Sequence, residues 1–580
     1  MTAPTTLTGV GVCAGVVVGP VRWMPGAVPE PVAGQPLAMD EREPECLRLV
    51  AATTAVQTAL DARAEAASGT ARAVLEATAL MAADPSLQDA ATGHVRERGL
   101  SAERAVWEAA GEVAAMIEAL GGYLAERARD VLDVRDRIVA ELTGRPAPGV
   151  PEPVAGQPFV LLAHDLAPAD TATLSPESVL ALVTVSGGPT SHTAIIARSL
   201  GLPAVVAVAD AERLATAGEL TDGTLVLVDG AAGTLLLAPD DEAQARARRL
   251  ASGRRRTLDG PGRTADGLRV SLLANVADGA SARAAAAAGA EGIGLFRTEL
   301  AFLDRTDPPS VEEQAALYAD VFAAFAGRRV VVRTLDAGSD KPLPFLDMGE
   351  EPNPALGVRG LRTALRAPQV LEDQLAAVAR ALAGQDAGQE GGPADVWVMA
   401  PMVSTADAAD GFVARCAAHG ITKAGVMVEV PSAALCSAQV LANVTFASIG
   451  TNDLTQYALA ADRLVGDLAT LNDPWQPGLL HLVAATCRGA AGLGPDGAGI
   501  PVGVCGEAAA DPALACVLVG LGVRSLSMSA PALPDVGAAL AGATSDLCRE
   551  AAAAVLTVRT ATEARAAARA LLTHLPALGL

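Results

Sequence analysis

The spacing of hydrophobic and polar residues changes at a few points along the chain. Between residues 41 and 143 the apolar positions recur at helical spacing, in segments rich in Ala, Leu, Glu and Arg such as AERARDVLDVRDRIVAEL. Asp84-Pro85 and Gly121-Gly122 interrupt this pattern as helix boundaries do. We therefore expect a bundle of helices, bounded by Pro- and Gly-rich segments at 25–36 and 145–158.

Short apolar runs flank this helical region. Residues 7–23 have the composition of strands, and after Phe159 the runs FVLLAH, VLALVTV, PAVVAV and TLVLVD alternate with helical segments. The simplest arrangement is one α/β domain made of residues 1–23 and 145–240, with a helical domain inserted at 28–144. The charged segment 241–262 predicts a helical connector that ends in a flexible hinge.

The remainder of the chain, 263–580, repeats one unit in which a short apolar strand precedes a helix. The candidate strands are 270–276, 291–297, 330–335, 396–401, 425–430, 446–450, 501–505 and 525–528. Eight such units predict a (β/α)₈ TIM barrel, whose active site lies at the C-terminal ends of the strands. Polar residues occur at those ends: Arg297 and Glu299, Arg333 and Asp336, Glu429, Asn452 and Asp453, and Cys505.

Composition narrows the range of partners. A chain of 580 residues is too long for a single core. Its net charge of −23 argues against nucleic acid as the main partner, because phosphate backbones require a basic surface.

We see no signal peptide and no membrane span, and we expect a cytoplasmic protein. The eight cysteines form no CxxC pair, which favours reduced thiols over a zinc site or disulfides.

A single histidine stands out in the segment GGPTSHTAIIAR. His192 follows a glycine turn and the hydroxyl residues Thr190 and Ser191, which are good N-caps, and it opens an apolar helical run. A helix N-terminus favours a bound phosphoryl group. One hypothesis is that His192 is a nucleophile that becomes phosphorylated. On this segment alone, a histidine that merely caps a buried helix fits equally well.

The arginines of the expected barrel indicate an anionic substrate. Arg297 and Arg333 end neighbouring strands, where two guanidinium groups can bind a phosphate and a carboxylate bidentately. A surface ion pair is the commoner role of a single arginine. Lys341, Arg359 and Arg463 lie in the loops that follow and can join them.

Three further strand ends supply oxygen and sulfur groups. Glu429 and Asp453 are hard oxygen donors that suit Mg²⁺, unless they simply pair with the arginines. Cys505, between Gly503 and Gly506, can donate a proton if its thiol stays protonated; a buried core cysteine is the alternative. Phosphoenolpyruvate fits this set of groups, because loss of its phosphoryl group leaves an enolate that needs a proton.

Several long motifs carry a specific resemblance that covers nearly the whole chain. They are GGPTSHTAIIARSLGLPAVV, EGIGLFRTELAFLDR, VVVRTLDAGSDK, NPALGVRG, GVMVEVPSAA, SIGTNDLTQYALAADR, GVCGEAAAD and SMSAPALP. With these motifs, in this order, the chain resembles the enzyme I family of the bacterial phosphoenolpyruvate:sugar phosphotransferase system. That family's reaction is the first step of sugar uptake by the system.

The resemblance implies a role for each matching residue. His192 would be the phosphohistidine, attacking through Nε2 and oriented by Thr171, and Cys505 would protonate the pyruvate enolate. Mg²⁺ would be held by Glu429 and Asp453. Phosphoenolpyruvate would be bound by Arg297, Arg333, Lys341, Arg359, Asn452, Asp453 and Arg463.

The resemblance also implies partners and a movement. The helical domain would dock the histidine phosphocarrier protein HPr, with candidate contacts at Glu76, Asp84, Glu126 and Arg135. The barrel would form a homodimer. Because His192 and the phosphoenolpyruvate pocket lie in different domains, we expect a swivel about 241–262 that brings them together.

Three departures from the family pattern bear on rates rather than on bond making. Pro189 stands where the family often has Arg, Ser339 replaces a Gly of the usual GGDK loop, and Ser525 replaces an aromatic residue.

A pyruvate phosphate dikinase or phosphoenolpyruvate synthase would need a large ATP-binding domain before His192, for which there is no room. A silent regulatory scaffold would be favoured by loss of His192, Cys505 or a magnesium carboxylate, all of which are present. A nitrogen-linked enzyme I homologue is also less expected, because it would usually carry an added sensory domain before the α/β domain.

Overall fold

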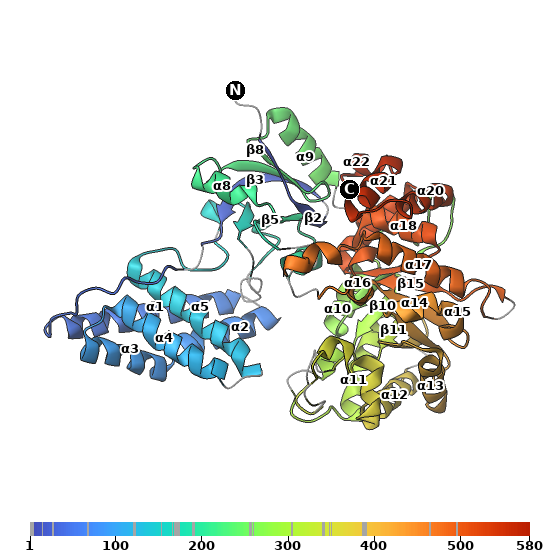
Figure 1. Ribbon diagram of the computed structural model, residues 1–580, viewed down its shortest axis with the longest axis horizontal. Helices are drawn as coiled ribbons and strands as arrows, with labels where there is room; N and C mark the ends of the chain where they lie inside the picture. The colour runs from blue at the N-terminus through green and yellow to red at the C-terminus, as the bar shows by residue number, and fades with distance from the viewer. Residues whose placement is uncertain are drawn as a thin grey trace.

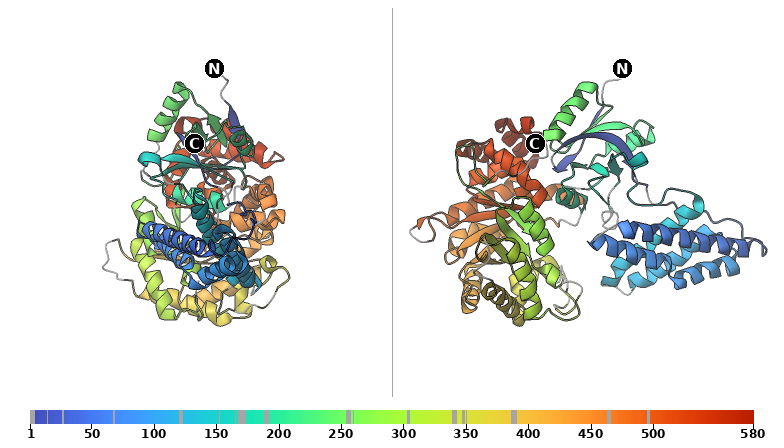
Figure 2. Two further views of the ribbon diagram at one scale, coloured as in Figure 1. Left: turned by 90° about the vertical axis from the view of Figure 1, so that its left-hand side faces the viewer. Right: turned by 180° about the vertical axis from the view of Figure 1, so that it is seen from behind.

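The computed structural model contains a helical bundle, a sheet domain and a barrel (Figure 1). The bundle stands to one side of the barrel, and the sheet domain lies between them at one end, as the view from behind also shows (Figure 2). The residues described are 5–580 except 14, 26–27, 67–68, 120–122, 152, 165, 167–173, 188–191, 254–257, 259, 303–304, 339–342, 347–348, 350, 386–390, 463–465 and 495–496.

The helical bundle has an apolar core made largely of small side chains. Its helices are α1 (Arg42–Ala66), α2 (Gly69–Ala82), α3 (Pro85–Arg98), α4 (Ala102–Ala119) and α5 (Tyr123–Thr143). Asp84 caps α3 by accepting a hydrogen bond from the Ser86 amide at 2.8 Å, and Gly99 ends it with a φ of 68°. Leu49, Val95 and Ile138 are fully buried between the helices.

The sheet domain joins segments from both sides of the bundle. Its strands are β1 (Thr6–Thr8), β2 (Val10–Cys13), β3 (Val16–Trp23), β4 (Phe159–Ala163), β5 (Val179–Thr184), β6 (Ala204–Val206), β7 (Leu225–Asp229) and β8 (Thr234–Leu237). They form one sheet in the order β1-β8-β7-β3-β4-β5-β6-β2. Strand β3 pairs in parallel with β4 and antiparallel with β7, so the N-terminal strand lies beside segments that follow the helical insertion.

In the described part of this domain, the sheet is accompanied by the helices α7 (His192–Leu200), α8 (Asp210–Thr216) and α9 (Asp241–Gly253). Helix α7 begins at His192 and is followed by Gly201, whose φ of 66° suits glycine. A Cβ atom on Gly201 would lie 3.0 Å from Cβ of Pro531, in the segment that follows the last barrel strand. The end of the histidine-bearing helix therefore abuts the rim of the barrel.

The barrel is closed and all-parallel. Its strands are β9 (Ser271–Val276), β10 (Gly292–Arg297), β11 (Arg329–Arg333), β12 (Asp395–Ala400), β13 (Ala424–Val428), β14 (Phe446–Gly450), β15 (Val502–Cys505) and β16 (Ser525–Met528). Each pairs with the next in sequence, and β16 pairs with β9. The predicted fold class, an α/β domain with a helical insertion plus a TIM barrel, is confirmed.

The barrel helices cover the outside of these strands. They are α10 (Gly279–Ala287), α11 (Val311–Ala324), α12 (Pro368–Ala383), α13 (Ala406–Ala418), α14 (Pro431–Leu435), α15 (Ser437–Val440), α16 (Thr451–Leu459), α17 (Pro477–Ala490), α18 (Pro512–Leu521), α19 (Leu533–Ala541), α20 (Ser545–Val555), α21 (Ala561–Leu571) and α22 (Leu575–Leu578). In the described part of the chain, no helix is both long and apolar enough to cross a membrane.

Two predicted strands, 330–335 and 425–430, run two residues too far, and the second, β13, ends at Val428. Strand β11 ends at Arg333, because the Leu335 amide donates to the side chain of Gln374 at 2.8 Å instead of continuing the ladder. This early end turns Asp336 toward the barrel mouth, where Arg333 and Arg359 contact it.

Candidate active site at the barrel mouth

Two arginines lie side by side where strands β10 and β11 end. Arg297 and Arg333 are register partners in this parallel pair, as expected from their places in the sequence. Arg297 is exposed, whereas Arg333 is buried. One guanidinium therefore faces the opening of the barrel and the other is held within it.

Carboxylates hold Arg333 in place. Its Nη2 pairs with Glu299, its Nη1 lies 3.4 Å from Oδ2 of Asp336, and Nη1 also contacts the sulfur of Met427 at 3.8 Å. Burial by itself would lower the pKa of Arg333, but the charges of Glu299, Asp336 and Glu429 outweigh it and raise that pKa. Nε of Arg333 is buried and has no hydrogen-bond partner among the described residues.

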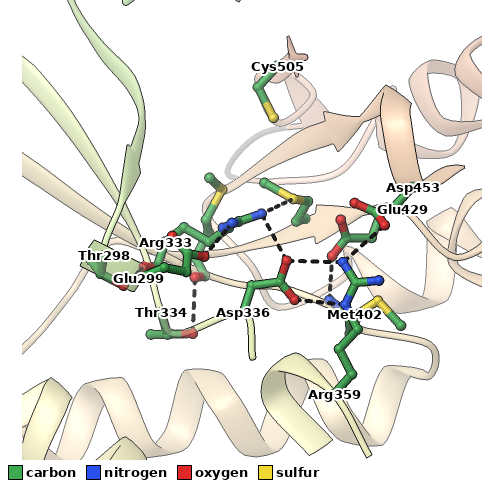
Figure 3. A network of polar contacts seen from close by, with 12 residues as sticks. Thr298, Glu299, Arg333, Thr334, Asp336, Arg359, Met402, Glu429, Asp453 and Cys505 are labelled. Atoms are coloured by element: carbon green, nitrogen blue, oxygen red, sulfur yellow. Dashed lines mark hydrogen bonds and ion pairs between the residues drawn. The ribbon is translucent and has the colours of Figure 1, made fainter. Parts of the chain in front are cut away.

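A second buried arginine links two segments of the mouth (Figure 3). Arg359 donates from Nε and Nη2 to the two oxygens of Asp336, at 3.2 and 3.1 Å, and from Nη2 to Oδ1 of Asp453 at 3.0 Å. Its Nη1 contacts the hydroxyl of Tyr457 at 3.2 Å. Arg359 is 1% exposed, so it organises the base of the site rather than its opening.

Glu429 follows strand β13 and is fully buried. Its Oε1 accepts a hydrogen bond of 2.6 Å from the amide of Met402, which has a φ of 58°. Its Oε2 has no hydrogen-bond partner within the described residues, and a Cβ on Gly450 would lie only 3.0 Å from it. Burial, reinforced by the charges of Asp453 and Asp336, raises the pKa of Glu429 to about 8. Arg333 acts to lower this pKa but does not outweigh burial and the two neighbouring carboxylates, so the site is short of positive charge.

The oxygen atoms here suit a divalent cation. Glu429 and Asp453 follow neighbouring strands, β13 and β14, and their charges influence each other. Carboxylate oxygens are the donors that Mg²⁺ prefers, and Mg²⁺ usually uses only one or two protein carboxylates. The described residues include no cluster of three or more His, Cys, Asp or Glu that could hold a metal. A cation here would therefore complete its shell with water and substrate oxygens.

Cys505 ends strand β15 and points toward these groups. Its Sγ accepts a hydrogen bond from Oγ of Ser448 at 3.4 Å and donates to the carbonyl of Ile449 at 3.7 Å. Burial raises the pKa of the Cys505 thiol, although Ser448, Arg333 and Arg297 each act to lower it. The thiol is therefore protonated at neutral pH and can donate a proton.

The turn after Cys505 requires glycine. Gly506 has a φ of 106°, and a Cβ there would lie 2.7 Å from Oγ1 of Thr451. This close approach lets the amide of Glu507 donate to Oδ1 of Asn452 at 3.3 Å. Asn452 is thereby fixed at the start of α16, beside Asp453.

The structure brings together seven of the residues chosen from sequence: Arg297, Arg333, Arg359, Glu429, Asn452, Asp453 and Cys505. Thr171, Lys341 and Arg463 lie outside the described residues, as do Pro189, Ser339 and the side chain of His192. Ser525 begins β16, at the end of the barrel away from the mouth.

The alternative to a magnesium site, in which both carboxylates simply pair with arginines, describes only one of them. Asp453 pairs with Arg359, whereas Glu429 takes a backbone amide instead. Asp336 and Glu299 are strand-end polar residues for which the sequence analysis predicts no role. Their role is to hold Arg333, and their only sequence signal was that position.

Comparison with known proteins covers all three parts of the chain. Residues 8–127 match the family described as PEP-utilising enzyme, N-terminal; residues 155–233 match its mobile domain, and residues 252–545 match its PEP-binding domain. A phosphoenolpyruvate-protein phosphotransferase of Streptomyces coelicolor is 52% identical over 98% of this chain and 99% of its own length. Another from Haloferax volcanii is 41% identical over 85% of each chain, and one from Staphylococcus carnosus is 35% identical over 80% of each.

Proposed function

This chain belongs to the phosphoenolpyruvate-protein phosphotransferases, and we propose that it transfers the phosphoryl group of phosphoenolpyruvate to its own His192 and then to the phosphocarrier protein HPr. The observation that carries the proposal is the combination of guanidinium groups and a protonated buried thiol at one barrel mouth. This substrate needs both: cations for its phosphate and carboxylate, and a proton for the enolate that it leaves.

Arg297 and Arg333 bind the substrate's anionic groups in this proposal. Arg297 is exposed at the mouth and can follow the phosphate as it moves. Arg333 is fixed by Glu299 and Asp336, and its unpaired Nε can donate to a substrate oxygen. Donors held in place before the substrate arrives stabilise developing charge without reorganising, which is the main source of catalysis in phosphoryl transfer. Lys341, Arg359, Asn452, Asp453 and Arg463 complete the proposed pocket.

The transfer breaks the bond between phosphorus and the enol oxygen and forms a bond from phosphorus to Nε2 of His192. The enolate that departs takes the proton of the Cys505 thiol at its methylene carbon and becomes pyruvate. Because burial keeps that thiol protonated, Cys505 is suited to be an acid at neutral pH. Thr171 would orient the imidazole.

Mg²⁺ is part of the proposal, held by Glu429 and Asp453. The unpaired Oε2 of Glu429 and its raised pKa both indicate a place for positive charge. When bound, the ion would neutralise charge on the substrate oxygens. Arg359 keeps Asp453 oriented for this role through their 3.0 Å contact.

The proposed movement brings His192 to this mouth. Helix α7 has nine residues and is therefore about 13 Å long, and its far end already lies against Pro531. Rotation about the 241–262 connector would bring the histidine end of α7 to the substrate, and closure would exclude water that would otherwise hydrolyse the phosphoryl group. A rigid cross-link that holds the sheet domain against the barrel in the arrangement described should stop autophosphorylation; unchanged activity would contradict the swivel.

The decisive experiment is the intact mass after incubation with phosphoenolpyruvate and Mg²⁺. We expect an acid-labile gain of one phosphoryl group that is absent from His192→Ala. His481→Ala is the matched control, since His481 is an exposed histidine on α17 and should be phosphorylated like the wild type. A gain with ATP alone would instead point to dikinase chemistry, and no gain with either would point to a silent scaffold.

We place HPr on the helical bundle. Leu47, Leu80 and Met116 are large apolar side chains exposed on this bundle. Among the predicted contacts, Glu76 is exposed and pairs with Arg72. Asp84 caps α3, and Arg135 stacks on the ring of Trp107 at 3.6 Å, so both have structural roles. The side chain of Glu126 lies outside the described part. Glu76→Lys therefore tests docking without removing a helix cap or an aromatic contact. It should weaken phosphoryl transfer to HPr and leave autophosphorylation unchanged, and equal loss of both would contradict the docking role.

The proposal includes a homodimer formed through the barrel. Among the described barrel leucines, the three most exposed are Leu356, Leu365 and Leu435. A second copy would remove them from water. Light scattering should give a dimer that the double variant Leu365→Asp, Leu435→Asp converts to monomer. Val32→Asp, at an exposed apolar residue outside the barrel, should remain dimeric.

A further inference from the structure

The barrel contains a cavity at the end opposite the mouth. The space in it that water can enter is about 20 Å³, which is room for about one water molecule. It is surrounded by the first residues of several strands, among them Arg329, Phe446 and Ser525. Arg329 lies over the ring of Trp397 at 3.9 Å on one side. The cavity therefore opens at the N-terminal face of the barrel, away from the phosphoenolpyruvate site.

Small residues create this space and make it polar. A Cβ on Gly294 would lie 2.5 Å from Oγ of Ser527, and a Cβ on Gly503 would lie 2.5 Å from Oγ of Ser525. Both strands therefore need glycine where the serine hydroxyls occupy the interior. A third hydroxyl, that of Ser448, lies in the wall on β14, whose register partner is Gly503. Apolar side chains such as Trp397 and Phe446 line much of the remaining wall, so these hydroxyls are the polar partners that a water in the cavity would need.

Ser448 connects this cavity to the thiol. Its side chain lines the cavity and its Oγ donates to Sγ of Cys505 at 3.4 Å. Cys505 itself is 2% exposed and does not line the cavity. Once substrate and the histidine domain cover the mouth, the groups next to the sulfur are those of the barrel interior. Ser448 is thus the polar side chain that bridges the thiol and the cavity.

We propose that Ser448 and the cavity below it form a proton path that reprotonates Cys505 from the N-terminal face of the barrel. The inference rests on the proposed function, in which Cys505 gives its proton to the enolate. The resulting thiolate takes the Ser448 hydroxyl proton while Oγ of Ser448 takes one from a water in the cavity. That water becomes hydroxide and is neutralised by solvent, so the net change is one proton moved from bulk water to sulfur. Ser448 acts through Cys505 and is a positioning and relay residue, since it does not touch the substrate.

The path predicts different effects on the first and on later turnovers. In Ser448→Ala the thiol starts protonated, so phosphorylation of His192 in a single turnover should stay within about twofold of the wild type. Steady-state pyruvate release with saturating HPr should fall about 100-fold, the low end of what proton-transfer groups contribute. The solvent deuterium isotope effect on that steady-state rate should rise.

Three companion variants make the test decisive. Ser448→Thr keeps the hydroxyl and should restore most of the steady-state rate. Thr486→Ala removes a buried hydroxyl from helix α17, outside the cavity, where it donates to the carbonyl of Leu482, and it should behave as the wild type. Ser525→Phe fills the cavity and should slow later turnovers as Ser448→Ala does.

The outcomes separate the path from its alternatives. An equal fall of first and later turnovers in Ser448→Ala would overturn the relay, because the hydroxyl would then only orient the thiol. An unchanged steady-state rate would overturn it too, because solvent would then reach Cys505 through the mouth. Failure of the wild type to be phosphorylated by phosphoenolpyruvate would instead refute the proposed function.

Discussion

Arg359 and Asp453, 94 positions apart in the chain, are joined by a 3.0 Å hydrogen bond at the base of the barrel mouth. The same Nη2 atom also donates to Asp336, which in turn contacts Arg333. The loop after β11 is thereby tied to the end of β14 through buried charge. Each buried charge in this set has a partner of opposite sign, which is the condition under which ionised groups are tolerated inside a protein.

Loss of Asp336 should destabilise the barrel by disrupting this network of buried ion pairs. Asp336→Ala leaves two buried guanidinium groups without the carboxylate they share, and breaking a buried pair in this way costs about 3–5 kcal/mol. We expect a correspondingly lower urea midpoint for the barrel transition, together with weaker binding of phosphoenolpyruvate.

The matched control for Asp336 is Asp320→Ala. Asp320 pairs with Arg283 at 2.7 Å, but both side chains are more than half exposed, so the loss should be below about 1 kcal/mol. Equal losses for the two variants would mean that the buried network does not contribute as described.

The thiol of Cys505 should react slowly with alkylating reagents. All eight cysteines are free, and Cys436 is exposed. Because burial raises the pKa of Cys505 above the ordinary thiol value, little of it is thiolate at pH 8, and its labelling by iodoacetamide should be at least about tenfold slower than that of Cys436. Peptide mass spectrometry over time measures both rates in one sample, and comparable rates would contradict a protonated donor.

Magnesium should stabilise the barrel through Glu429. At a concentration 100 times its Kd, a ligand that binds only the folded state adds about 2.7 kcal/mol, so Mg²⁺ should raise the Tm and a chelator should reverse the gain. Glu429→Gln keeps the shape of the side chain but removes its charge, and it should show little gain. Glu372→Gln, which changes a carboxylate on the outside of the barrel that pairs with Arg415, should respond as the wild type does.

Helix α11 should lose its N-terminal cap in acid. Ser310 and Glu313 form a capping box, and hydrogen bonds from the Ser310 amide and hydroxyl, with Arg305 nearby, lower the pKa of Glu313 to about 2. A lowered pKa means that the stabilisation is complete above the unfolded value near 4.5 and is lost as the pH falls toward 2. The stability difference between wild type and Glu313→Gln should therefore be largest at pH 7 and shrink below pH 4.5, as measured by urea unfolding at several pH values. A difference that stays constant over this range would rule out the ionised cap.

The amino-acid sequence determined the kind and order of the elements. Periodicity distinguishes helix from strand because burial of one face is a local property. Eight strand–helix repeats then leave few alternatives to a closed barrel, in which the strand ends, and with them Arg297 and Arg333, meet at one mouth. The motifs around His192 and Cys505 identified the family before any contact was known.

Tertiary structure alone decided which polar groups meet. Nothing in the sequence around Glu429 indicates that its carboxylate accepts from the Met402 amide and leaves one oxygen without a partner among the described residues. The contact of Ser448 with Cys505 likewise joins positions 57 apart, through strands whose pairing creates the cavity beneath them. Spacing records whether a side chain is buried, whereas the partner that satisfies a buried charge or hydroxyl depends on which distant strand lies beside it.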